Sequence, residues 1–358
     1  MTTTAEVTDA TRAASALLDR AHAGDPSCIT RISGGGNSRV HRVDTDAGAF
    51  ALKVYFRDGH GGRHRRATEF AALSFLRRQG VLSVPEPLAS DAALGASLFS
   101  YIDGAVVPSE QATAADVEHL ANFLVALRRL CKQPGAVDLP AASEAMFSLD
   151  ALVANISRRR QRLAEAKATT ATHALLTEFL QDQFDPTLAA AVDWARGLLN
   201  RHGLAPDREL EHAARTLSPS DFGFHNVLRT RDGRLVFVDF EYFGWDDPAK
   251  MVSDFLLHPG MALGKPLRGH FLSRVLAGFG AGDPLAVRIR VAYVLYALKW
   301  CMIVLNEFVP EHLQRRLFAN PGSEPEDLQR RQLAKANALL AQARDGLVVF
   351  PYEEWMCL

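Results

Sequence analysis

The stretch that decides the fold is Ser218–Pro248, SPSDFGFHNVLRTRDGRLVFVDFEYFGWDDP. Its Asp232-Gly233 pair lies between two apolar runs, and such a pair is a strong signal for a β-hairpin. Folding the chain symmetrically about this pair sets Asn226 opposite Asp239, with Cα atoms about 5 Å apart. Asp221 lies on the loop that leads into the first strand, so we expect it within reach of the same point.

This hairpin would gather two carboxylates and a carboxamide. Mg²⁺ prefers hard oxygen ligands of this kind, taking one or two carboxylates and leaving its other positions to water and substrate phosphates. Asn226 and Asp239 are therefore candidate Mg²⁺ ligands. The alternative is that these Asp and Asn residues serve only local hydrogen bonding at turns and strand ends.

The bulk composition bounds the possible functions. The chain has 358 residues, 48% hydrophobic and 23% charged, which is ordinary for a soluble globular protein and long enough for two lobes. Its net charge of −1 gives no basic footprint for nucleic acid. We expect no signal peptide and no apolar segment of the roughly 20 residues that a membrane span needs. Together with four scattered cysteines, which favour reduced thiols over disulfides or zinc, this predicts a cytoplasmic protein.

The pattern of elements changes near residue 105. Before it, short β-like runs alternate with turn residues, and they fall at 28–33, 39–43, 49–55 and 96–102. One helix interrupts them at 63–80, closed by Gly80. Beyond residue 110, helical spacing dominates, over 113–135, 149–167, 172–184, 186–203 and 285–308. The last of these is apolar enough to lie near the centre of a helical bundle.

A second group of candidate residues lies upstream of the hairpin. The segment SGGGNSRVHRV (33–43) is a glycine-rich turn, which lets backbone N–H groups approach a phosphate closely. Glu69 shares the apolar face of its helix with Leu73 and Leu76, and a buried carboxylate is costly unless it is paired. We expect it to pair with Lys53 of the adjacent sheet, holding that lysine against a nucleotide phosphate. The alternative is that Lys53 and Glu69 are both exposed surface residues.

In this order and spacing the residues resemble the aminoglycoside phosphotransferase and choline/ethanolamine kinase superfamily, from about Arg31 to Asn306. The motifs that carry the resemblance are GGGNS, Lys53, Glu69, SLFSYIDG, SDFGFHN and VDFE, followed by YFGWDDPAKMVSDF. The resemblance implies an α+β, protein-kinase-like fold with two lobes. Residues 1–103 would form a nucleotide-binding lobe, a small antiparallel sheet with one helix. Residues 104–358 would form a larger, mainly helical lobe with the catalytic loop and the acceptor site.

The resemblance also implies a role for each matching residue. Asp221 would be the catalytic base, and Asn226 and Asp239 would hold Mg²⁺. Lys53, held by Glu69, would contact the phosphates of ATP or GTP. The loop over the phosphates and the segment beside the adenine would be formed by Gly35, Gly36, Asn37, Ser38, Phe99, Tyr101 and Ile102. Phosphoryl transfer needs mostly positioning and charge neutralisation, which such a set supplies.

One position departs from the pattern of the family. Its members commonly have His two residues before the catalytic Asp, and this chain has Pro219 there. Ser220 or His225 could supply a replacement hydrogen bond. The departure keeps open a second function, a nucleotide-binding pseudokinase that acts as a scaffold or regulatory partner.

The acceptor is expected to be a small hydroxylated molecule that binds beside Asp221. Aromatic faces and a carboxylate would suit the cation of an amino alcohol or amino sugar. The candidates are Tyr242, Trp245, Trp300 and Glu307, with core packing as the alternative for the two tryptophans. The sequence thus predicts an ATP- or GTP-dependent kinase of a small metabolite, with nucleotidyl transfer on the same fold as a further alternative. A protein kinase fits least, because no activation loop or Ala-Pro-Glu anchor follows the hairpin.

Overall fold

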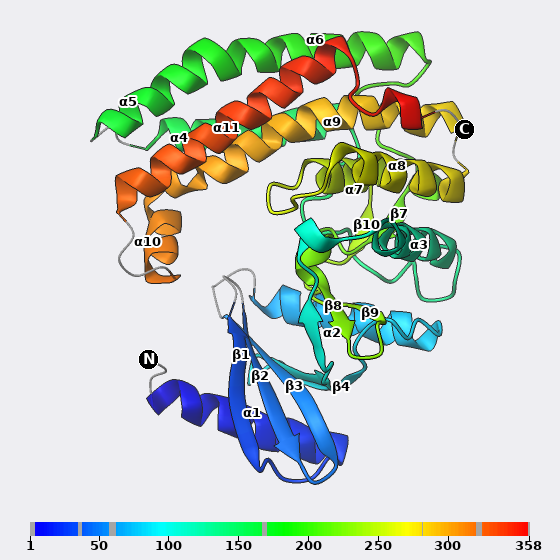
Figure 1. The fold of residues 1–358 in the computed structure, drawn as a ribbon, viewed down its shortest axis with the longest axis vertical. Helices are drawn as coiled ribbons and strands as arrows, with labels where there is room; N and C mark the ends of the chain where they lie inside the picture. Colours follow the sequence, from blue (N-terminus) through cyan, green and yellow to red (C-terminus); the bar gives the residue numbers. More distant parts are fainter. Residues whose placement is uncertain are drawn as a thin grey trace. The chain divides into compact units, whose positions relative to one another are not determined.

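The structure is a computed structural model that describes residues 4–34, 38–56, 62–166, 170–280, 282–319 and 324–356. The chain divides into two compact units (Figure 1). The first consists of residues 1–119, 126–143 and 217–245, and the second of residues 120–125, 144–216 and 246–358. An antiparallel sheet dominates the first unit and helices dominate the second, which confirms the expected α+β class. The lobe boundary between residues 103 and 104 stays a prediction.

The first unit is built on a five-stranded antiparallel sheet in the order β1-β2-β3-β5-β4. The strands are β1 (Cys28–Gly34), β2 (Ser38–Thr45), β3 (Gly48–Tyr55), β4 (Pro87–Asp91) and β5 (Ala96–Ser100). Lys53 of β3 pairs with Val40 of β2 and with Ser97 of β5, so it lies in the middle of the sheet.

Two helices cover the two faces of this sheet. Helix α1 (Thr4–Ala21) packs the apolar residues of its inner stripe against Leu52 and Leu98. Helix α2 (Gly62–Arg78) covers the opposite face, toward which Lys53 points because successive strand residues alternate in direction. Helix α1 adds to the one helix that the sequence predicts in this part. The spacing of Ala10, Ala13, Ala14, Leu17 and Leu18 is helical and could have revealed it.

The hairpin that follows Asp221 has a register that corrects our expectation. Strand β8 (Val227–Thr230) pairs with β9 (Leu235–Phe237), with Val227 opposite Phe237. Asn226 lies opposite Val238, whose N–H donates to its carbonyl at 3.0 Å, and the expected pairing with Asp239 is wrong. The cause is a loop of three residues, in which Gly233 adopts a left-handed φ of 84°, where a two-residue loop was expected.

Short elements complete the surroundings of this hairpin. Strand β6 (Gly104–Val106) joins β8 and β9 in a three-stranded sheet, and β7 (Thr216–Ser218) pairs with β10 (Gly244–Asp246). Helix α3 (Ala114–Leu130) has residues in both units, and it begins with a capping box between Thr113 and Asp116.

The second unit is a helical bundle centred on α9 (Gly282–Val304), as expected from its apolar sequence. Helix α9 packs against α4, α6, α7 and α11 (Figure 1). The other elements are α4 (Leu149–Ala164), α5 (Ala171–Glu178), the π-helical turn η2 (Phe179–Phe184), α6 (Asp185–Arg201), α7 (Pro248–Leu257), α8 (Lys265–Phe279), α10 (Pro310–Ala319) and α11 (Pro325–Val348).

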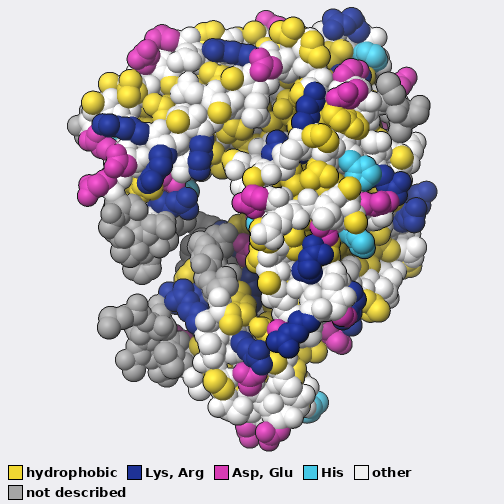
Figure 2. Space-filling model, in the orientation of Figure 1, with side chains coloured by type: hydrophobic (Ala, Val, Ile, Leu, Met, Phe, Trp, Pro, Cys, Tyr) yellow, Lys and Arg dark blue, Asp and Glu magenta, His cyan; other side chains and the backbone are white. Residues whose placement is uncertain are grey.

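One described segment, Gly282–Phe308, is long and apolar enough by composition to cross a membrane. This corrects the expectation that no segment reaches that length. However, 72% of its apolar window is buried inside the protein, and the core helix of a soluble protein passes the same test of length and composition. Basic and acidic side chains are interspersed on the face shown in Figure 2, in keeping with the net charge of −1.

Candidate functional site

The site is centred on Lys53, whose side chain is only 8% exposed. Its Nζ lies 2.7 Å from Oε2 of Glu69 on α2 and 2.6 Å from Oδ1 of Asp239, which follows β9. A third carboxylate, that of Glu241, lies 3.4 Å from the same nitrogen. The ion pair expected between Lys53 and Glu69 is thus present, and one ammonium group joins the sheet, the helix and the segment after the hairpin.

Further hydrogen bonds hold Glu69 in this position. The hydroxyl of Tyr55 donates to its Oε2 at 2.6 Å, and the N–H of Phe240 donates to its Oε1 at 3.2 Å. Tyr55 lies two residues after Lys53 on β3, so the two side chains share one face of the sheet. Both oxygens of the buried carboxylate are therefore satisfied, which offsets much of the cost of burying it.

The charges of this cluster shift its pKa values. Burial by itself would lower the pKa of Lys53, but the carboxylates of Glu69, Asp239 and Glu241 outweigh it and raise the pKa above its usual value. Burial raises the pKa of Glu69, and the ammonium group of Lys53 partly offsets this effect. Burial and then the charge of Glu69 also raise the pKa of the Tyr55 hydroxyl, so it remains a hydrogen-bond donor.

The donor set fits a divalent cation. Single carboxylate oxygens of Glu69, Asp239 and Glu241 lie within 4.8 Å of one another. All three carboxylates lie within 3.4 Å of the ammonium group of Lys53. The Asp239 side chain is 40% exposed and could reach an ion at the edge of the cluster. Mg²⁺ prefers hard oxygen ligands of this kind and is usually bound through one or two carboxylates.

The loop predicted to be catalytic, around Asp221, lies in the same compact unit as Lys53. Its Asp221 carboxylate is 43% exposed, and Oδ1 lies 2.9 Å from Nε2 of His225. The side-chain amide of Asn226 donates to the carbonyl of Asp221 at 3.0 Å, which ties the two ends of the loop together. With its Nδ2 engaged in this way, Asn226 has its carboxamide oxygen as the atom that could bind a metal ion.

Two residues beside these groups have a strained backbone. Ser220 has a φ of 67° and Asp239 a φ of 66°, in the left-handed region that non-glycine residues rarely adopt. Such strain costs about 1–3 kcal/mol per residue and persists only where surrounding contacts enforce it. For Ser220 these include a hydrogen bond from its hydroxyl to the carbonyl of Ser143 at 2.9 Å. For Asp239 they include the ion pair with Lys53.

The other residues predicted to contact the nucleotide are placed as follows. Gly35, Gly36 and Asn37 lie outside the described residues. Ser38 is buried at the start of β2, opposite Tyr55 of β3. Phe99 is buried on β5, and Tyr101 and Ile102 follow that strand, with the guanidinium group of Arg42 over the ring of Tyr101. Their roles stay predictions.

The predicted acceptor residues are largely engaged in internal contacts. Trp245 is buried in the first unit and donates from Nε1 to the carbonyl of Ala136 at 2.9 Å, which favours its alternative role in core packing. Tyr242 is half-buried. In the second unit, Glu307 accepts from Gln332 at 2.9 Å and pairs with Arg316 at 3.1 Å.

Trp300 belongs to a buried polar network of the second unit. Its Nε1 donates to Asp254 at 3.0 Å, and Asp254 in turn lies 3.3 Å from Nζ of Lys250. Lys250 also pairs with the fully buried Asp246 at 2.7 Å. Burial raises the pKa of Asp246 to about 6, although the positive charge of Lys250 partly offsets this effect. Trp300 remains half-buried, so its ring could still contact a ligand.

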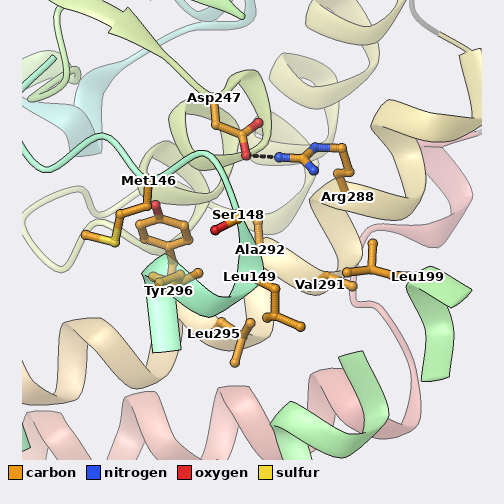
Figure 3. A pocket seen from close by; sticks show the side chains of 11 residues that line it. Met146, Ser148, Leu149, Leu199, Asp247, Arg288, Val291, Ala292, Leu295 and Tyr296 are labelled. Carbon is orange, nitrogen blue, oxygen red and sulfur yellow. Dashed lines mark hydrogen bonds and ion pairs between the residues drawn. The ribbon is translucent and has the colours of Figure 1, made fainter. Parts of the chain in front are cut away.

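A cavity of about 40 Å³ lies in the second unit between α4 and α9 (Figure 3). Its lining is mostly apolar, with the ion pair between Asp247 and Arg288 at one side. The hydroxyl of Tyr296 is buried and has no hydrogen-bond partner among the described residues. The volume is far below the several hundred Å³ of a metabolite pocket, so this is not the acceptor site.

Sequence reasoning missed two residues of the lysine cluster. Tyr55 had a signal, since it lies two positions after Lys53 on the same strand and therefore on the same face. Glu241 had the same kind of signal, two positions after Asp239. Glu241 could not be assigned from this spacing alone, because the segment after β9 is not a regular strand.

The chain was compared with known families and structures. A family model described as a phosphotransferase enzyme family matches residues 29–289. A comparison with curated protein sequences gave no match.

Three solved structures illustrate the structural similarity. A Ralstonia eutropha protein, provisionally assigned as an aminoglycoside phosphotransferase, is 12% identical with a TM-score of 0.61 over 94% of this chain and 98% of its own. A choline/ethanolamine kinase family protein from Mesorhizobium loti is 17% identical, with a TM-score of 0.56 over 90% and 92%. A spectinomycin phosphotransferase in complex with ADP and spectinomycin is 12% identical, with a TM-score of 0.57 over 89% and 94%. At these identities the similarity shows the shared fold.

Proposed function

Because the chain belongs to the phosphotransferase enzyme family, we propose that it transfers the γ-phosphoryl group of ATP or GTP to a hydroxyl group of a small molecule. The observation that supports this most is the position of Lys53, held between Glu69 on α2 and Asp239 after β9. A buried ammonium group fixed by two carboxylates is suited to neutralise nucleotide phosphates. Because its side chain is already ordered, it loses little conformational entropy when the nucleotide binds.

The nucleotide would bind to the first compact unit. Lys53 would contact its phosphates, and Ser38 with the loop before it would cover them. Phe99, Tyr101 and Ile102 would lie beside the base. The solved spectinomycin phosphotransferase with this fold was crystallised with ADP, which supports nucleotide use by the same architecture. ATP and GTP are both compatible with these residues.

Asp239 and Asn226 are the residues that would hold Mg²⁺, and the carboxylates of Glu69 and Glu241 lie close to that of Asp239. When bound, the ion would neutralise charge on the transferred phosphoryl group and on the leaving diphosphate. The left-handed backbone of Asp239 directs its carboxylate to Lys53. The protein's own contribution is therefore to hold one carboxylate and one ammonium group in fixed positions before substrate arrives.

Asp221 would act as the base for the acceptor. Its carboxylate would accept the proton of the acceptor hydroxyl while that oxygen forms a bond to the γ-phosphorus atom. The bond from this phosphorus atom to the bridging oxygen breaks, and the nucleoside diphosphate leaves with the electron pair. The proton remains on Asp221 until the product departs. Asn226 stabilises the loop in this conformation by its bond to the Asp221 carbonyl.

The acceptor in this proposal is a small hydroxylated molecule. The related structures include a choline/ethanolamine kinase family protein and a spectinomycin phosphotransferase, so the fold serves small hydroxylated substrates. Tyr242 and Trp300 remain candidate contacts because both are half-buried. Trp245 and Glu307 are weaker candidates, since Trp245 is buried and Glu307 already has a basic partner in Arg316.

The test is metal-dependent nucleotide turnover by the wild type and by Asp221→Asn and Asp239→Asn. A pool of hydroxylated metabolites is included and screened by mass spectrometry for the addition of one phosphoryl group. We expect a product only with Mg²⁺ and intact Asp221, with turnover reduced at least about 100-fold in Asp221→Asn. Addition of a nucleotidyl group would overturn the proposed reaction. Nucleotide binding without any product would favour the scaffold function that Pro219 suggests.

A further inference from the structure

The backbone around Asp221 is held by bonds within its own loop. The N–H of Asp221 donates to the carbonyl of Pro219 at 2.9 Å, and the N–H of Ser220 donates to Oγ of Ser218 at 3.0 Å. At the other end, Asn226 binds the carbonyl of Asp221 at 3.0 Å. These bonds fix where the Asp221 side chain begins. They do not fix the plane of its carboxylate, because the terminal torsion of Asp is broad.

The side chain of His225 supplies a bond that can fix this plane. Its Nε2 lies 2.9 Å from Oδ1 of Asp221, four residues earlier on the same loop. An ionised carboxylate is only an acceptor, so Nε2 must carry the hydrogen. His225 is the middle residue of a short 3₁₀ turn, Phe224–Asn226. The side chain of Phe224, the first residue of this turn, is buried, so the turn that carries the imidazole is anchored.

The residue two positions before Asp221 cannot donate a hydrogen bond to its carboxylate. Pro219 has no N–H and no polar side-chain atom, so it offers no donor to the carboxylate. The hydroxyl of Ser220 donates to the carbonyl of Ser143 at 2.9 Å. His225 contacts the Asp221 carboxylate directly.

We propose that His225 is a positioning residue for the phosphoryl transfer, which holds the Asp221 carboxylate through Oδ1 and directs Oδ2 to the acceptor hydroxyl. This inference rests on the proposed function, in which Asp221 is the base. His225 itself touches neither nucleotide nor acceptor in this assignment. Its loss should therefore lower kcat and leave the affinity for nucleotide and the KM for acceptor nearly unchanged.

The experiment compares three substitutions at this position in the full chain. In Gln the side-chain nitrogen Nε2 is the same number of bonds from Cα as Nε2 of His, so His225→Gln keeps a donor at the same reach. In His225→Asn the donor is one bond shorter, and in His225→Leu there is none. Rates of Mg²⁺-dependent ATP turnover are measured with binding of a non-hydrolysable ATP analogue and the unfolding temperature.

A hydrogen bond to a charged group corresponds to roughly a tenfold to hundredfold effect. We therefore expect kcat to fall by that factor in His225→Leu and His225→Asn, and to recover to within about threefold of wild type in His225→Gln. Binding of the ATP analogue should change less than twofold in all three. If His225→Gln is as slow as His225→Leu while both are folded and bind the analogue, the proposed role is wrong. Unchanged kcat in His225→Leu would overturn it equally.

A spectroscopic measurement separates this inference from the proposed function. Long-range ¹H–¹⁵N NMR of histidine side chains reports which ring nitrogen carries the hydrogen, and the His225 signals are identified by their absence in His225→Gln. We expect the Nε2–H form in the wild type and a shifted Nε2 signal in Asp221→Asn. If the wild type turns over no nucleotide, the proposed function fails whatever this spectrum shows. If it turns over nucleotide but the Nε2 signal does not respond to Asp221→Asn, only the role of His225 fails.

Discussion

At the scale of single residues, Lys53 contacts three carboxylates of the described site. It is nearly buried, and it is the ammonium group that faces Glu69, Asp239 and Glu241. Removing one carboxylate from this cluster and removing its cation are therefore not equivalent changes. The first relieves repulsion among acidic groups, and the second leaves the buried carboxylates of Glu69 and Glu241 without the ammonium group that contacts them.

We predict that Lys53→Met lowers the free energy of unfolding by about 3 kcal/mol, while Glu69→Gln lowers it by only about 1 kcal/mol. The glutamine keeps a side-chain oxygen for Tyr55 or for the N–H of Phe240. Urea unfolding of both variants at pH 7 measures the difference. A Lys53→Met protein as stable as Glu69→Gln would mean that the carboxylates are compensated by something other than Lys53.

Tyr296 allows a second prediction at this scale. Its buried hydroxyl has no partner among the described residues, and burying such a group costs about 1–3 kcal/mol. Tyr296→Phe removes the hydroxyl and keeps the ring, so we expect the free energy of unfolding to rise by about 1 kcal/mol. Thermal and urea unfolding against wild type measure this. A loss of stability would show that the cavity in Figure 3 holds an ordered partner for the hydroxyl.

At the scale of elements, the hairpin of β8 and β9 shows how loop length decides register. Gly233 has a φ of 84° and no heavy atom within 4 Å of the position that a Cβ would occupy. A substitution there is opposed by backbone conformation alone. The three-residue loop moves every pair by one position relative to a two-residue loop, which is why Asn226 faces Val238.

We predict that Gly233→Ala lowers the free energy of unfolding by about 1 kcal/mol, and that Gly233→Asn lowers it by less, because Asn tolerates the left-handed region. Chemical denaturation of the two variants measures the difference. Equal losses would indicate that a side chain at this position meets a steric barrier that the structure does not contain.

Glu144 contacts two helices of the second unit, α4 and α9, and its ion pairs should make stability depend on pH. Its carboxylate contacts Lys299 of α9 at 3.1 Å and Arg159 of α4 at 2.8 Å. Burial would raise its pKa, but these two positive charges outweigh burial and lower the pKa from its usual value of 4.5 to about 2. A lowered folded-state pKa stabilises the fold above the unfolded pKa, and this stability is lost as the pH falls through the folded pKa.

We therefore predict that wild type exceeds Glu144→Gln in free energy of unfolding by a constant amount above about pH 5, and that the difference shrinks between about pH 4.5 and pH 2. The side chain is 42% exposed, so solvent screening limits the difference to about 1 kcal/mol. Urea unfolding of both proteins from pH 7 down to the lowest pH at which they fold measures it. A difference that is unchanged at pH 3 would contradict the ion-pair origin.

At the scale of the whole molecule, the candidate catalytic residues belong to one of the two compact units. Lys53, Asp221 and Asp239 all lie in the first compact unit, although Lys53 is more than 160 residues before the other two in the chain. The second unit is a helical bundle with its own buried polar network around Lys250. Ligand binding by the proposed site should therefore stabilise the first unit directly.

We predict that a non-hydrolysable ATP analogue with Mg²⁺, at 100 times its dissociation constant, stabilises the first unit by about 2.7 kcal/mol and raises its unfolding temperature by about 5–10 °C. Either component alone should do much less, because Mg²⁺ lacks the phosphate ligands and the analogue lacks charge neutralisation. Differential scanning calorimetry measures the shift. Asp239→Asn is the matched control, and a full shift in that variant would exclude Asp239 as a ligand of the ion.

The sequence by itself determined the family pattern, the helical second unit with its central α9, and the ion pair of Lys53 with Glu69. These follow from local chemistry: an apolar helical stripe identifies buried positions, and a buried carboxylate requires a cation. Only the tertiary structure decided the hairpin register, the approach of Asp239 and Glu241 to Lys53, and the bond between His225 and Asp221. These depend on loop length and on left-handed backbone at Ser220, Gly233 and Asp239, which arise where surrounding contacts override the preferences of single residues.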